Sequence, residues 1–111
     1  MNMIALSKYY RGEVQRAVSQ LRKFLPEKII IYGSVASGNP RNGSDVDFLV
    51  VKKTKKPFLQ RNIEAASYLD LDIPYDVFVV TPEELQKGII LHDAFFTEVI
   101  NTGKVIYARS S

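Results

Sequence analysis

The chain has 111 residues, of which 46% are hydrophobic and 24% charged, and its formal net charge is +3. This length suits a single domain, residues 1–111, and the ordinary composition excludes disordered and fibrous proteins. Because cysteine is absent, disulfide bonds and thiolate metal sites are excluded as well. No apolar run reaches the roughly 18 residues of a membrane span, so we expect a cytoplasmic protein with no membrane partner. The mild positive charge favours anionic ligands in general, and direct binding of nucleic acid is not expected.

The first half of the chain predicts alternating helices and strands. Apolar residues recur at offsets of three and four over residues 7–25, which predicts an amphipathic helix that stops at Pro26. Continuous β-branched and aromatic runs at 29–32 and 48–51 predict two short buried strands. The connector between them is rich in Gly, Asn, Pro and Ser, so we expect a loop after one helical turn over residues 34–37.

The middle of the chain continues this alternation. The lysine-rich segment 52–56 predicts a solvated loop, with a grip on nucleotide phosphates as the alternative. Pro57 suits the first turn of a helix, and the apolar spacing after it predicts that this helix runs to Asp70. Pro74 cannot join a central strand, so the next apolar run predicts a strand over residues 75–80.

The last third of the chain predicts two helices and an edge strand. Residues 81–84 (TPEE) have the pattern of a capping box, which starts one helix and explains its glutamates without catalysis. Residues 92–101 have helical spacing and precede Gly103, and residues 104–108 alternate weakly. The single histidine, His92, is expected to have a structural or surface role. The order of elements predicts an α/β (α+β) fold with a mixed sheet of three or four strands and helices mostly on one face.

Two aspartates stand where the second strand begins. Side chains alternate faces along a strand, so Asp45 and Asp47 project from the same face with Cα atoms about 6–7 Å apart. Carboxylates this close repel each other unless a cation or solvent compensates them, and two Mg²⁺ ions about 3.5–4 Å apart would also support chemistry. Gly33 ends the first strand without a Cβ, and Ser34 opens a short helix whose free N–H groups attract phosphate. The predicted order is a phosphate cradle, a connector and a metal-binding strand.

This arrangement resembles a known signature. Gly33-Ser34, ten residues and then Asp45-Val46-Asp47 are similar to the GS-x10-DxD motif of the DNA polymerase beta-like nucleotidyltransferase superfamily. The resemblance implies the polymerase beta-like nucleotidyltransferase core, and an enzyme that uses two Mg²⁺ ions to transfer a nucleoside monophosphate from a nucleotide triphosphate. The alternative is a chance match between a turn serine and two solvated aspartates. The resemblance covers nearly the whole chain, because the smallest members, the minimal nucleotidyltransferases (MNT), contain little beyond this core.

The resemblance also implies the catalytic carboxylates. Asp45, Asp47 and Asp76 would be the catalytic and metal-binding residues, and Asp76 matches by position the third carboxylate that activates the acceptor hydroxyl. Its alternative is a solvated aspartate at a strand end. Asp70 and Asp72 are weaker candidates, since they precede Pro74 in the connection to the strand.

The nucleotide contacts follow from the same resemblance. Gly33 and Ser34 would hold the distal phosphates of ATP. Family members often carry an arginine directly before the second glycine, where this chain has Ser37 before Gly38. Arg41 is the local candidate to replace that contact, and an exposed loop arginine is the alternative.

A protein partner is the last implication of the resemblance. MNT proteins are commonly encoded beside a helical HEPN-type toxin that they neutralise, and such antitoxins transfer AMP from ATP onto a tyrosine of the toxin. We therefore expect an AMPylating antitoxin, a view that the small size supports because little chain is left for an acceptor site. Two alternatives stand beside it: an antitoxin that acts by binding alone, and a free-standing nucleotidyltransferase for a small molecule or RNA end.

Overall fold

The core of the protein is a mixed four-stranded sheet. The computed structural model describes residues 8–38 and 45–110. Within these ranges the strands are β1 (Lys28–Tyr32), β2 (Val46–Val51), β3 (Tyr75–Val80) and β4 (Lys104–Ala108). Their order in the sheet is β3-β2-β1-β4; β1 runs antiparallel to β2 and β4, whereas β2 and β3 are parallel. The predicted fold class is confirmed.

Helices flank this sheet and are close to the expected segments. They are α1 (Lys8–Leu21) with the 3-10 turn η1 (Arg22–Phe24), α2 (Gly33–Ala36), α3 (Phe58–Ala66), α4 (Pro82–Ile90) and α5 (Ala94–Thr102). The helix expected to end at Asp70 is shorter, because the amides of Tyr68 and Leu69 bond three residues back and close a turn instead of a further α-helical turn. The expected capping box at the start of α4 is present, with Thr81 and Glu84 exchanging hydrogen bonds.

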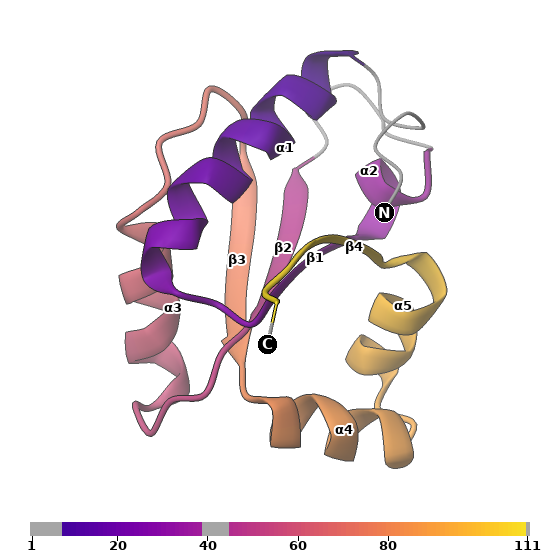
Figure 1. The fold of residues 1–111 in the computed structure, drawn as a ribbon. Helices are drawn as coiled ribbons and strands as arrows, with labels where there is room; N and C mark the ends of the chain where they lie inside the picture. Colours follow the sequence, from indigo (N-terminus) through magenta and orange to yellow (C-terminus); the bar gives the residue numbers. More distant parts are fainter. Residues whose placement is uncertain (1–7, 39–44, 111) are drawn as a thin grey trace.

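Both faces of the sheet are packed, and each strand divides its side chains between them. In β2, Val46, Phe48 and Val50 join the larger core with α1, α2 and α3, and Leu49 and Val51 join the smaller core with α4 and α5. Figure 1 shows α1 and α3 on one side of the sheet and α4 and α5 on the other. The helices therefore cover both faces of the sheet, whereas the sequence predicted them mostly on one face. Asp47 belongs by alternation to the face of α4 and α5.

Helix α3 covers part of the outer edge of β3. The Val79 N–H donates to Asn62 Oδ1 at 2.7 Å, and Arg61 donates to the Val79 carbonyl at 3.2 Å. The buried Arg61 guanidinium also binds both carboxylate oxygens of Glu84 on α4, at 2.6 and 3.2 Å. This bidentate pair joins α3 to α4 beside the sheet edge. No helix in residues 8–38 or 45–110 is long and apolar enough to cross a membrane.

Candidate active site

One row of polar side chains crosses three strands of the sheet. Tyr32 at the end of β1 pairs with Asp47 near the start of β2, and Asp47 pairs in turn with Asp76 of β3. Residues directly opposite each other in a sheet project from the same face. The structure thus brings two of the three carboxylates expected from the sequence into register, on the face of α4 and α5.

Asp45 lies immediately before β2 and is exposed, and alternation places it on the side of Asp47. The half-buried Asp47 has its pKa raised to about 6, first by burial and then by the negative charges of Asp76, Asp45 and Glu98. These groups are therefore close enough to act on one another electrostatically. A cation bound among them would relieve that repulsion.

Glu98 of α5 is a fourth acid at this site and was not expected from the sequence. Its Oε1 lies 3.9 Å from the point where a Cβ on Gly33 would stand. Burial, together with Asp47, Asp76 and Glu98, raises the pKa of Tyr32, so this phenol stays protonated. A signal for Glu98 exists in the sequence, because Glu98 follows Phe95 by three residues and therefore shares its helix face.

Gly33 connects the first strand to the acidic row. Its φ of +81° is in the left-handed region, and a Cβ there would stand 2.5 Å from Asp47 Oδ2. The Gly33 N–H donates to Thr102 Oγ1 of α5 at 2.9 Å. Ser34 is exposed in the first turn of α2, where the N-cap residue Tyr32 makes no side-chain hydrogen bond. The glycine thus lets Asp47 approach the backbone, and the first turn of α2 starts without a side-chain cap.

The carboxylate oxygens of this site are ligands of the kind that Mg²⁺ binds. Among the residues that the structure describes, no group of three or more acidic, histidine or cysteine side chains is arranged to hold a metal by itself. Mg²⁺ sites of this kind commonly use one or two carboxylates together with substrate phosphates, so a closed protein cage is not required. The carboxylates of Asp45, Asp47 and Asp76 are hard oxygen donors of that type. Burial, and then the neighbouring negative charges, raise the pKa of Asp47, and a bound cation would offset those charges.

Three other sets of residues were candidates for contacts with the ligand. Arg41 lies outside the described residues. The weaker candidates Asp70 and Asp72 form surface ion pairs with Arg16 of α1, at 4.0 and 3.2 Å. In the lysine-rich segment, Lys52 donates to the carbonyl of Phe24, which directs its ammonium group to the protein itself.

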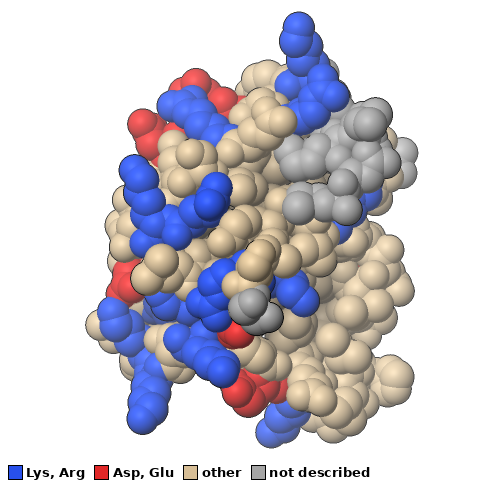
Figure 2. All heavy atoms as spheres, in the orientation of Figure 1, with Lys and Arg blue, Asp and Glu red and all other residues tan. Residues whose placement is uncertain are grey.

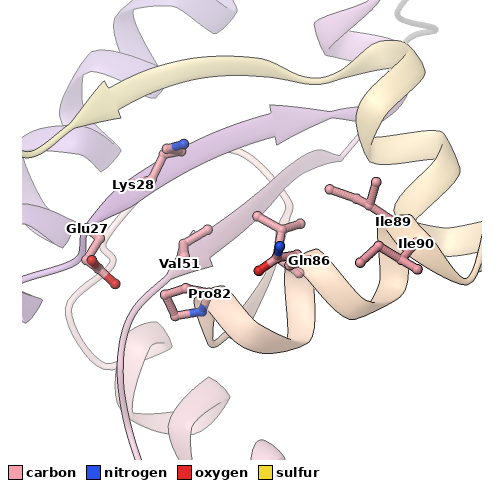
Figure 3. Close-up of a pocket in the computed structure, with 8 residues that line it drawn as sticks. Glu27, Lys28, Val51, Pro82, Gln86, Ile89 and Ile90 are labelled. Carbon is pink, nitrogen blue, oxygen red and sulfur yellow. The ribbon is translucent and has the colours of Figure 1, made fainter.

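The hollows on the face of α4 and α5 include two that differ in size and lining. The larger, about 470 Å³, lies between the start of β1 and helix α4, with Lys28, Val51 and Ile89 in its lining (Figure 3). Lys28 is four residues from Tyr32, so this hollow starts about 13 Å along the strand from the acidic row. The smaller, about 290 Å³, is lined by aromatic residues and Val80 on the β3 side. Phe78 in its lining follows Asp76 by two residues, which makes it the hollow nearer the acids.

Comparisons with known proteins agree with this geometry. The family model "Polymerase beta, Nucleotidyltransferase" matches residues 17–111, so the chain belongs to that nucleotidyltransferase family. A crystal structure of a candidate nucleotidyltransferase from Sulfolobus solfataricus has a similar fold, with a TM-score of 0.64 and 16% identity over 97% of this chain and 94% of that chain. A crystal structure of a toxin-antitoxin with AMP-PNP is also similar, with a TM-score of 0.53 and 22% identity over 86% of this chain and 73% of that chain. No curated protein matches the chain.

Proposed function

We propose that this protein is a Mg²⁺-dependent nucleotidyltransferase and an antitoxin, which transfers AMP from ATP onto a tyrosine hydroxyl of a HEPN-type toxin. The observation that carries the proposal is the register of Asp47 and Asp76 on neighbouring strands, with Asp45 two residues before Asp47, in a chain of this family. Among the residues that the structure describes, neither Asp47 nor Asp76 forms an ion pair that would explain why the two carboxylates lie in register. A metal-dependent reaction on a phosphate does explain it.

Each residue of the site has a proposed role. Asp45, Asp47 and Asp76 would hold two Mg²⁺ ions, and these ions would supply charge neutralisation at the triphosphate. Asp76 accepts the proton of the acceptor hydroxyl, whose oxygen then bonds to the α-phosphorus of ATP. The bond between that phosphorus and the bridging oxygen breaks, and pyrophosphate leaves. Ser34 and the backbone after Gly33 hold the distal phosphates. Arg41 is proposed to assist them.

The toxin partner is supported by similarity and by size. The toxin-antitoxin structure described above contains AMP-PNP, an ATP analogue, and shares the fold of this chain. The described helices and strands are all used to build the sheet and its two covering layers. An acceptor carried by another folded protein needs only a docking surface of about 800 Å² from each side. The protein is proposed to act in the cytoplasm, as one nucleotidyltransferase domain.

The test is to co-express the protein with the product of the neighbouring gene and to weigh that product by intact mass spectrometry. We expect a gain of about 329 Da for each AMP transferred, which follows from the chemistry of the two-metal reaction. Asp45→Asn and Asp76→Asn should abolish the gain. Asp70→Asn, which changes an exposed aspartate paired with Arg16, is the matched control and should retain it.

The outcomes separate the proposal from its two alternatives. An unmodified product that still forms a stable complex with the protein would favour an antitoxin that acts by binding alone. A product that is neither modified nor bound, with ATP still consumed when small molecules or RNA are supplied, would favour the free-standing nucleotidyltransferase. A gain in mass that survives Asp45→Asn would contradict the proposed site.

A further inference from the structure

The smaller hollow beside the acidic row is lined by aromatic rings. Its walls are Phe58 at the start of α3, Phe78 and Val80 of β3, and Phe95 and Phe96 of α5. None of these five side chains carries a hydrogen-bond donor or acceptor. At about 290 Å³ it is just below the roughly 300–1,000 Å³ typical of small-molecule sites, which leaves room for an aromatic ring.

A continuous series of ring contacts links this cavity to the acidic row. Tyr32 packs edge to face with Phe95 at 5.4 Å between ring centroids, and Phe95 packs edge to face with Phe78 at 6.0 Å. Phe78 stacks on Phe58 at 5.9 Å. Asp76 and Phe78 are two residues apart on one strand and therefore share a face, with Cα atoms about 6–7 Å apart. Phe78, one wall of the cavity, therefore lies two strand positions from the proposed base on the same face of the sheet.

We propose that this aromatic cavity binds the ring of the acceptor tyrosine and thereby directs its hydroxyl to Asp76. This inference rests on the proposed transfer to a tyrosine and assigns the part of this chain that selects that side chain. A phenol suits the cavity because its ring needs only apolar and aromatic contacts, which the four phenylalanines offer. Its hydroxyl, the one polar group, extends towards the carboxylate that takes the proton.

A nucleobase suits the same walls less well. Each base carries several donors and acceptors along its edges, and burying them against Phe and Val would leave them without partners. A serine or threonine acceptor would leave the aromatic walls unfilled. The cavity therefore favours a phenolic acceptor over an aliphatic one, and this selectivity is measurable without the toxin.

The first experiment measures binding in the absence of transfer. N-acetyl-tyrosinamide is titrated into the metal-free protein while the backbone and ring resonances of the cavity residues are followed by NMR. We expect saturable shifts in the millimolar range at Phe58, Phe78 and Phe96, with no comparable shifts there from adenosine or N-acetyl-serinamide. Shifts from adenosine alone would assign the cavity to the nucleobase and overturn the proposal, as would no saturable shift from any probe.

The second experiment uses a matched pair of variants on one helix. Phe58→Ala removes a partly exposed ring that lines the cavity. Leu59→Ala truncates the next residue, which is exposed and does not line the cavity. We expect the affinity for N-acetyl-tyrosinamide to fall about tenfold in Phe58→Ala, because a stacked ring contact is lost, and to stay unchanged in Leu59→Ala. Equal affinities in both variants would overturn the proposal.

These readouts are separate from the test of the proposed function. Tyrosine binding without any gain in mass on the toxin would keep the cavity as an aromatic site and reject the transfer. A gain in mass that proceeds with an unchanged KM for the toxin in Phe58→Ala would keep the transfer and reject the cavity.

Discussion

At the scale of single residues, Asp47 is the most constrained group of the site. It is half-buried, pairs with Asp76 across the parallel strands and touches the glycine that ends β1. Its pKa near 6 means that the folded protein holds a proton on Asp47 more tightly than the unfolded chain does. The ionised form required for binding a metal is therefore the form that the ligand-free fold disfavours.

A pH dependence follows for Asp47→Asn. As pH rises from the ordinary aspartate pKa of about 4 through about 6, ionisation of Asp47 destabilises the folded parent and leaves the variant unaffected. Solvent screening at this partly exposed group limits the effect to about 1 kcal/mol. In thermal melts without metal, the two proteins should differ little at pH 4, and the variant should melt about 4 °C higher above pH 6.5. Asp70→Asn is the control, and a difference that does not grow with pH would contradict the assignment.

A second prediction separates two effects of replacing a glycine: the backbone strain at a positive φ, and the loss of the space that Asp47 occupies beside Gly33. Gly33 and Gly38 both have positive φ, of +81° and +83°, yet an added Cβ meets Asp47 at 2.5 Å in the first and nothing within 4 Å in the second. Alanine at either position should destabilise the fold by about 1–2 kcal/mol through strain. Mg²⁺ with ATP is expected to raise the melting temperature of the parent, because it binds the folded state. Only Gly33→Ala should also lose this rise. An equal rise in both variants would show that Gly33 does not position Asp47.

The sequence predicted those carboxylates that belong to a local pattern. Asp45 and Asp47 are separated by two positions in a strand, so alternation alone places them on one face, whereas Asp76 was expected from the resemblance to the nucleotidyltransferase family. Their register, Asp47 opposite Asp76, could not be derived, because it depends on where two distant strands begin to pair. Glu98 was missed for a related reason: a single glutamate on an amphipathic helix is ordinary until the helix is placed against the sheet.

At the scale of elements, α3 stabilises the strand that carries Asp76. Asn62 and Arg61 satisfy the backbone N–H and C=O of Val79 on the outer edge of β3. An uncovered edge at this place would be open to pairing with another strand. The sequence predicted α3 from apolar spacing, but not that two of its polar residues serve the sheet, since hydrogen bonds between distant segments leave no periodic signal.

The buried guanidinium of Arg61 gives the element-scale prediction. Arg61→Met removes the guanidinium that donates to Glu84 and to the Val79 carbonyl, so we expect a loss of about 2–3 kcal/mol in the free energy of unfolding, measured by urea denaturation. Hydrogen bonds from Arg61 also lower the pKa of Glu84, so part of this stabilisation should disappear in acid as Glu84 is protonated.

Arg16→Met is the matched control for that substitution. Arg16 forms its ion pairs with Glu13, Asp70 and Asp72 on the surface, where such pairs contribute about 0–1 kcal/mol. If the two variants lose equal stability, the link between α3 and α4 is not the important contact that the geometry indicates.

At the scale of the whole molecule, the charged side chains are distributed unevenly over the surface. Figure 2 shows basic and acidic side chains gathered over the side of α1 and α3, whereas the surface over α5 shows little charge in this view. Helices α4 and α5 leave several apolar side chains exposed, among them Ile90, Leu91 and Ile100. The sequence did not predict that α4 and α5 would cover the second face of the sheet. An apolar pattern shows that a helix is amphipathic, but it does not show which face of the sheet that helix covers.

The hydrogen bond from Gly33 to Thr102 has a consequence for synthesis on the ribosome. The acids and the glycine come from segments that are far apart in the sequence, and Glu98 and Thr102 lie on α5, which follows the strands that carry the other site residues. During translation the earlier strands emerge first, at about 5–20 residues per second, and domains of this size fold as units. A nascent chain that ends before α5 lacks both the group that holds Gly33 and the fourth acid. The complete site therefore forms only once the chain has been made through α5, and translation products that end before α5 do not contain it.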